Sequence, residues 1–80
     1  MGQKPIDVIV GERLEVLRTS RGVTLDQLGS VIGRTGSQVA DYEAGRVRIP
    51  SADLIEICRF FHVTIQSLFP SQDPDQDPLS

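Results

Sequence analysis

The sequence predicts an all-α fold, and three observations support this. Two pairs of residues have the spacing of a capping box, which marks the start of a helix: Thr24 with Gln27, and Thr35 with Gln38. Apolar residues recur at helical spacing before, between and after these starts. Glycines, which readily adopt the left-handed conformation that ends a helix, stand where the repeats break off: Gly22, Gly33 and Gly45. Together these signals predict one compact domain of five short helices.

The first helix is expected over residues 8–21. Its apolar positions follow the i, i+4, i+7 pattern of one helix face, with Val16 beside them: Val10, Leu14 and Leu17. Asp7 is placed to cap its start, because an aspartate side chain accepts hydrogen bonds from the first turn. Residues 1–5 show no pattern, and a flexible N-terminus is expected over residues 1–7.

The central segment, residues 24–45, is expected to form two helices joined at Gly33. The first buries one apolar face: Leu25, Leu28, Val31 and Ile32. In the second only Val39 and Tyr42 are large and apolar, so the other residues are expected to face outward: Gly36, Ser37, Gln38, Ala40 and Asp41. The first helix packs into the core and the second exposes one face to solvent, which is the layout of a helix-turn-helix. In that motif the second helix enters the major groove of DNA.

A short basic loop, Arg46–Ser51, leads into a fourth helix with a wide apolar stripe: Leu54, Ile55, Ile57, Cys58 and Phe61. Thr64 is placed to cap a fifth, short helix that runs to Phe69. The domain is therefore expected to span residues 8–70. Residues 71–80 have almost no apolar content and repeat Asp-Pro, which predicts a disordered acidic tail.

The composition fits a small intracellular domain. Eighty residues allow one modest core, and a single cysteine cannot form an intramolecular disulfide. No apolar run approaches the length that crosses a membrane, so a cytoplasmic location is expected. The net charge is −3, but three aspartates lie in the last ten residues, which leaves eight acidic and eight basic residues in 1–70. A neutral body can bind DNA when its few arginines share a face.

Three motifs follow one another in a fixed order: R-x-x-x-G-x-T-x-x-Q-L-G-x-x-x-G from Arg18, V-x-x-Y-E-x-G from Val39, and L-x-x-I-C-x-x-F-x-V from Leu54. In this register, over nearly all of residues 8–69, the chain resembles the Xre/Cro family of lambda-repressor-like helix-turn-helix domains. The resemblance implies a compact five-helix domain, usually bacterial or phage. It also implies a transcriptional regulator that binds a two-fold related DNA operator as a dimer.

The resemblance further implies roles for individual residues. It places a structural ion pair at Arg18 and Glu43, and a small residue, Gly29, where the two hinged helices approach. It implies contacts with DNA phosphates at Thr24, Thr35, Arg46, Arg48 and Ser51. It implies readout of bases at Arg34, Gly36, Ser37, Gln38 and Asp41.

The chain departs from the family pattern in ways that affect readout. Leu25 stands where many members have a glutamine that touches the DNA backbone. The presented helix carries short side chains, and Gln38 is either free to reach a base or committed to its capping box. Direct readout is therefore expected to be sparse, with DNA shape supplying part of the specificity.

Phe60 lies outside the apolar stripe of the fourth helix. Together with Ile65 it can form a self-complementary dimer patch, which would set two recognition helices about 34 Å apart, one turn of DNA. The alternative is a single exposed aromatic side chain, which is common on protein surfaces. The family resemblance favours the dimer.

The sequence predicts no enzyme. One histidine, one cysteine and scattered acids supply no nucleophile with a base, no metal-ligand spacing and no phosphate-binding glycine loop. No cofactor, metal or small-molecule ligand is expected. The leading hypothesis is a dimeric, sequence-specific DNA-binding regulator at the nucleoid. The alternative is a protein-interaction module on the same fold, an antitoxin-like partner or an accessory subunit, which the short-side-chain helix and the acidic tail would suit.

Overall fold

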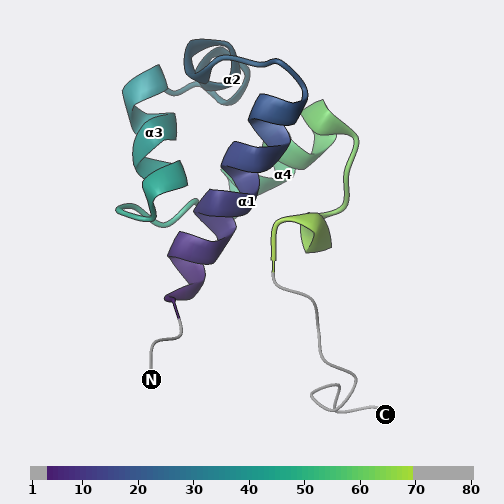
Figure 1. Cartoon of the computed structure of the whole chain (residues 1–80). Coiled ribbons are helices and arrows are strands. Elements are labelled where there is room, and N and C mark those ends of the chain that lie inside the picture. Colours follow the sequence, from purple (N-terminus) through teal and green to yellow (C-terminus); the bar gives the residue numbers. More distant parts are fainter. Residues whose placement is uncertain (1–3, 70–80) are drawn as a thin grey trace.

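Four α-helices and one 3-10 turn make up residues 4–69, the part of the chain that the computed structural model describes (Figure 1). The helices are α1 (Ile6–Ser20), α2 (Leu25–Ile32), α3 (Gly36–Ala44) and α4 (Ser51–Phe61), and the turn is η1 (Ile65–Ser67). The all-α prediction is confirmed. The count of five helices is wrong. The acidic tail and the first three residues of the predicted flexible N-terminus lie outside the described residues.

The fifth predicted helix is only the single turn η1. Thr64 has the extended backbone of a cap residue, but its side chain makes no cap hydrogen bond. Leu68 is fully buried and anchors the segment, whereas all three residues of η1 are exposed. A segment this short forms too few backbone hydrogen bonds to offset the cost of nucleating an α-helix.

Both predicted capping boxes are present. The Thr24 hydroxyl accepts from the Gln27 backbone N–H at 3.0 Å, and the Gln27 side chain accepts from the Thr24 N–H at 2.8 Å. Thr35 and Gln38 repeat this exchange at the start of α3, at 3.1 and 2.9 Å. The two helices end at left-handed glycines, Gly33 with φ 72° and Gly45 with φ 77°. The central pair of helices therefore starts and stops where local sequence predicts.

Helix α1 starts two residues earlier than predicted. Pro5 is the cap residue, and its carbonyl accepts from the backbone N–H groups of Val8 and Ile9 at 3.0 and 3.1 Å. The prediction that Asp7 caps this helix is wrong, because Asp7 lies inside the first turn. Its carboxylate instead accepts a hydrogen bond from Arg48, 41 residues away, at 3.1 Å.

The core lies where the four helices meet. In Figure 1 α1 runs through the middle of the molecule, and α2 and α3 pack against each other, with α3 also against α1 and α4 against α2. The core contains the following fully buried side chains: Leu14, Leu28, Val39, Ile57 and Leu68. Val16 and Ile55, which the periodicity placed beside the apolar stripes, are 67% and 48% exposed. Among residues 4–69, no helix combines the length and apolarity needed to cross a bilayer.

Gly29 and Gly11 allow helices to approach closely. A Cβ at Gly29 would lie 2.6 Å from the Arg34 carbonyl oxygen, so only a glycine fits where α2 meets the turn before α3. Gly11 has the same role between α1 and α3, because a Cβ there would collide with the Tyr42 carbonyl oxygen. Sequence reasoning identified Gly29 but missed Gly11.

Candidate nucleic-acid interface

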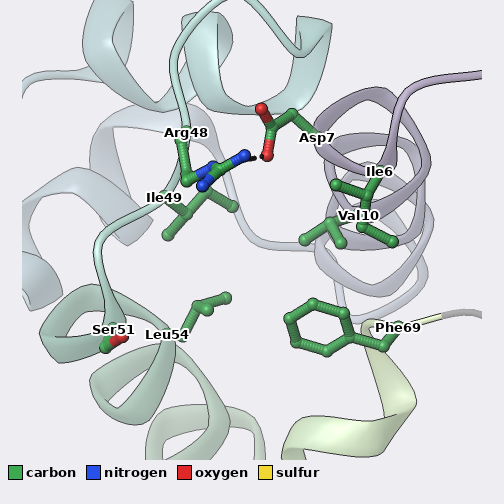
Figure 2. Close-up of a pocket in the computed structure, with 8 residues that line it drawn as sticks. All are labelled: Ile6, Asp7, Val10, Arg48, Ile49, Ser51, Leu54 and Phe69. Atoms are coloured by element: carbon green, nitrogen blue, oxygen red, sulfur yellow. Dashed lines mark hydrogen bonds and ion pairs between the residues drawn. The ribbon is translucent and has the colours of Figure 1, made fainter.

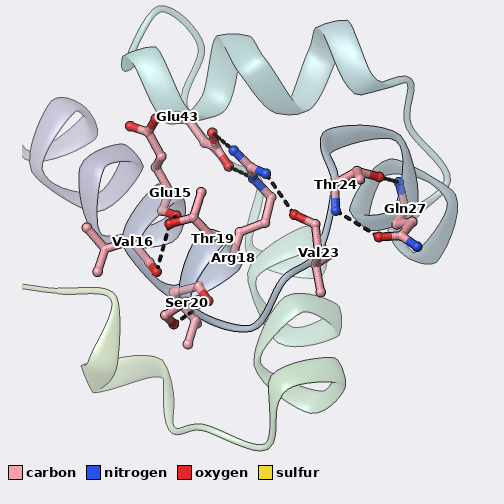
Figure 3. A network of polar contacts seen from close by, with 10 residues as sticks. Glu15, Val16, Arg18, Thr19, Ser20, Val23, Thr24, Gln27 and Glu43 are labelled. Carbon is pink, nitrogen blue, oxygen red and sulfur yellow. Dashed lines mark hydrogen bonds and ion pairs between the residues drawn. The ribbon is translucent and has the colours of Figure 1, made fainter.

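A buried ion pair holds α3 in place (Figure 3). Arg18, at the end of α1, donates from Nε and Nη2 to the Glu43 carboxylate at 2.5 and 3.1 Å, and from Nη1 to the Val23 carbonyl at 2.8 Å. The two residues are only 9% and 8% exposed. The hydrogen bonds with Glu43 raise the pKa of Arg18, so the guanidinium stays protonated. One side chain thus joins α1, α3 and the loop before α2.

The outer face of α3 carries few side chains. Ser37 and Gln38 are exposed, and Asp41 is partly exposed. The Gln38 side-chain oxygen is committed to the capping box, so only its amide NH2 group lies outside that box. The groups on α3 that can hydrogen-bond directly to bases are therefore a hydroxyl, an amide group and a carboxylate.

Gly36 does not face outward, so its predicted place on the presented surface is wrong. It is buried, and a Cβ built on it would collide with the Asp26 side chain in the first turn of α2. Its lack of a side chain lets the start of α3 rest against the start of α2. Gly36 is a packing position.

Each arginine predicted to contact DNA is paired with an aspartate from a distant part of the chain or from α3 itself. Arg34 donates to Asp53 at 2.9 and 3.4 Å, Arg46 to Asp41 at 3.2 Å, and Arg48 to Asp7 at 3.1 Å. The Arg46 and Arg48 side chains remain 71% and 76% exposed. Exposed pairs of this kind are weak, so both arginines can exchange an aspartate for a phosphate. The positive charge around α3 is nevertheless partly balanced.

The remaining predicted phosphate contacts lie at helix starts. Thr24 and Thr35 are exposed cap residues of α2 and α3, and Ser51 is the exposed first residue of α4. A threonine hydroxyl that accepts from the backbone can still donate its own hydrogen. The first backbone N–H groups of a helix also attract anions. These three positions can therefore donate hydrogen bonds to phosphate oxygens.

Sequence reasoning missed Asp53. It is 6% exposed and receives hydrogen bonds from Arg34 and from the Tyr42 hydroxyl, the latter at 2.7 Å. Burial raises the pKa of Tyr42, and the bond to Asp53 raises it further. An acidic residue that falls in line with Ile57 on the apolar stripe of α4 was the available signal, because a buried carboxylate requires partners.

The predicted dimer residues are exposed. Phe60 is 41% and Ile65 is 43% exposed. Ile55, which is 48% exposed, lines a shallow hollow with Ile65, and Phe60 is not among the residues that line it. The Phe60 ring stands edge-on to Phe61 with centroids 4.9 Å apart. Each of the two predicted dimer residues is therefore accessible to a partner chain.

A cavity of about 300 Å³ lies between the start of α1, the loop before α4, α4 and the end of the described chain (Figure 2). The Arg48–Asp7 ion pair lies at one side of it, opposite Leu54 and Phe69. Most of its lining is apolar: Ile6, Val10, Ile49, Leu54 and Phe69.

Comparison with known proteins gives a consistent family signal. The family model of a helix-turn-helix domain matches residues 9–68. An HTH-type transcriptional regulator of Sinorhizobium medicae is 34% identical over 65 residues, which is 81% of this chain and 47% of that protein. The chain thus spans about half the length of the relative it matches.

Solved structures share the fold. The restriction-modification controller protein C.AhdI of Aeromonas hydrophila has a TM-score of 0.72 and 26% identity, over 78% of this chain and 94% of that one. The DNA-binding domain of S. venezulae BldD has a TM-score of 0.70 and 25% identity, over 81% and 97%. With the family model, these likenesses confirm the family resemblance drawn from the sequence.

Proposed function

This chain belongs to the helix-turn-helix domain family, and we propose on that premise that it is a DNA-binding transcriptional regulator that inserts α3 into the major groove of an operator. One observation carries the proposal. A short helix with an exposed outer face is held between capped ends, with the partly exposed Arg34 before it and the exposed Arg46 and Arg48 after it. The regulator relative and the DNA-binding domain among the similar structures support the same class.

The contacts divide into two sets. Ser37, the amide group of Gln38 and Asp41 face the bases, where they can hydrogen-bond to base edges. The phosphates are bound by exposed residues at the loop and the helix starts: Thr24, Thr35, Arg46, Arg48 and Ser51. Because base contacts are few, sequence-dependent DNA shape supplies part of the specificity.

The regulator binds as a dimer in this proposal. Phe60 and Ile65 form the shared patch, and a two-fold axis through it sets two copies of α3 on successive major-groove turns. Residues 8–70 form the DNA-binding domain, and the protein works at the nucleoid in the cytoplasm.

Selection from a random duplex pool tests the function. The expected result is enrichment of a palindromic sequence whose binding weakens steeply as salt rises, because each neutralised phosphate releases counterions. Lack of enrichment at low salt would count against the proposal.

That second outcome would favour a protein-interaction module, which one observation supports. All three arginines around α3 are already paired with aspartates, so this surface is close to charge balance. Such a surface suits a protein partner of mixed charge. Purification with a tagged chain from cells would then be the informative experiment.

A further inference from the structure

The buried carboxylate of Asp53 connects three segments of the chain through hydrogen bonds. Asp53 lies in the first turn of α4, Tyr42 on α3, and Arg34 in the turn between α2 and α3. Asp53 Oδ2 accepts from Arg34 Nε at 2.9 Å and from the Tyr42 hydroxyl at 2.7 Å, while Oδ1 faces Arg34 Nη2 at 3.4 Å. The network therefore links the helix-turn-helix to the helix that follows it.

The network fixes the Arg34 side chain. A carboxylate that is 6% exposed must keep its partners, because an unpaired buried charge is costly. Its place in the first turn of α4 adds the favourable field of a helix N-terminus, which stabilises the carboxylate. Two parallel hydrogen bonds along one edge of the guanidinium fix its plane as well as its position.

The same network leaves part of Arg34 available. Its side chain is 36% exposed, and Nη1 makes no hydrogen bond to any residue that the structure describes. Arg34 lies beside Thr35, the cap of α3, and reaches the first turn of α4, where Ser51 is exposed. It stands between two helix starts whose backbone N–H groups favour an anion.

We propose that Arg34 binds a DNA phosphate through its free guanidinium edge, and that Asp53 and Tyr42 are positioning residues that hold it in place. This inference rests on the proposed function. It revises the sequence-based assignment of Arg34 to base readout. A guanidinium that is already ordered loses little side-chain entropy on binding, so the pairing with Asp53 prepares the contact.

The test uses the full chain and duplexes recovered from the random pool. Arg34→Ala should weaken binding to preferred and random duplexes alike, by about tenfold, and lower the salt slope by about one. Arg13→Ala, on the exposed outer face of α1, is the matched control and should change neither. A lost preference for one base would overturn the phosphate assignment and restore base readout.

Positioning is tested by a double-mutant cycle. The factor by which Arg34→Ala lowers DNA affinity should be clearly smaller in an Asp53→Asn background, because Arg34 is no longer held there. Equal losses in both backgrounds would overturn the role of Asp53. Tyr42→Phe, which removes only the hydroxyl, provides the same comparison if Asp53→Asn does not fold, and circular dichroism reports folding.

The two proposals fail in different ways. If the wild-type chain selects no duplex, the proposed function fails before Arg34 is considered. If the wild type binds but Arg34→Ala binds equally well, only the role of Arg34 is overturned.

Discussion

At the scale of single residues, Glu43 and Asp53 are buried carboxylates whose arginine partners lie 25 and 19 residues away. The capping partners, in contrast, are three residues apart, and local spacing was enough to predict them. The Arg18–Glu43 pair was expected from the family resemblance. The Arg34–Asp53 pair was not expected, because the partner of a charged side chain depends on how the helices pack. Gly36 was misplaced for the same reason, since its neighbour Asp26 belongs to another helix.

Removing one member of the buried pair should be costly. In Arg18→Met, Glu43 stays buried without its partner, so the free energy of unfolding should fall by about 3–5 kcal/mol in a urea titration. The double replacement Arg18→Met with Glu43→Leu should recover most of that loss, because apolar side chains of similar volume often replace a buried pair without penalty. A single variant as stable as the parent would show that the pair contributes little.

Acid sensitivity should depend on Asp53. Burial alone would raise its pKa, but hydrogen bonds from Arg34 and Tyr42, with the charge of Arg34, bring the pKa below its usual value. The stabilisation is therefore fully present above the pKa of aspartate in the unfolded chain, about 4, and is lost as the pH falls through the lower folded pKa.

The comparison uses urea unfolding of the wild type and Asp53→Asn at successive pH values. The wild type should lose more free energy of unfolding than the variant as the pH falls below about 4. Parallel curves would mean that Asp53 is not held in its charged form.

At the scale of elements, α2 and α3 matched their predicted starts and stops because caps and left-handed glycines are encoded locally. Local signals did not predict that α1 starts at Ile6, or that the last element is a single 3-10 turn and not a fifth α-helix. Asp7 is drawn to Arg48 by a contact that exists only after folding. The η1 segment has an apolar anchor, yet it is too short to hold a helix.

Gly29, which lies in α2 against the turn before α3, should not tolerate an added methyl group. Alanine normally stabilises a helix interior by about 0.5–1 kcal/mol relative to glycine. Here the added Cβ would lie 2.6 Å from the Arg34 carbonyl, so the sign reverses, and Gly29→Ala should lose about 1–3 kcal/mol in thermal unfolding. The control Ser30→Ala, on an exposed position of the same helix, should stay within about 0.5 kcal/mol. An unchanged melting temperature for Gly29→Ala would show that the hinge can open freely.

At the scale of the whole molecule, the net charge could be predicted from the sequence, but the ion-pair partners could not. Residues 1–70 were expected to have no net charge. In the structure, the three arginines around α3 are each paired with an aspartate. Charge counting cannot reveal this, because it carries no information about neighbours. The exposure of Phe60 was predicted, because Phe60 breaks the helical period of its own helix, whereas the exposure of Val16 and Ile55 was not.

Charge balance should set the strength of non-specific binding. Arg46→Ala should weaken binding to every duplex and lower the salt slope by about one. Asp41→Asn, which removes the carboxylate paired with Arg46 at 3.2 Å, should raise affinity for random duplex at low salt. Fluorescence anisotropy with a labelled random duplex measures both. Identical affinities for all three proteins would place this loop outside the interface.

The dimer patch can be tested without DNA. Phe60→Glu puts a charge on the proposed apolar contact and should shift the solution mass towards the monomer in sedimentation equilibrium. Val16→Glu is the matched control, because Val16 is also exposed but lies on α1. If the two variants have the same mass as the wild type, this patch is not the dimer contact.

The Arg18 side chain also constrains how the molecule comes apart. Its bonds to Glu43 and Val23 close a 25-residue loop that contains α2 and most of α3. Detachment of α3 would break the bonds to Glu43, and α2 packs against α3, so the two helices are expected to open together as one cooperative unit. Backbone amides in α2 and in α3 should then exchange with solvent deuterium at a shared rate, slower than the amides of η1. The proposed DNA-binding surface is therefore expected to be either fully assembled or absent.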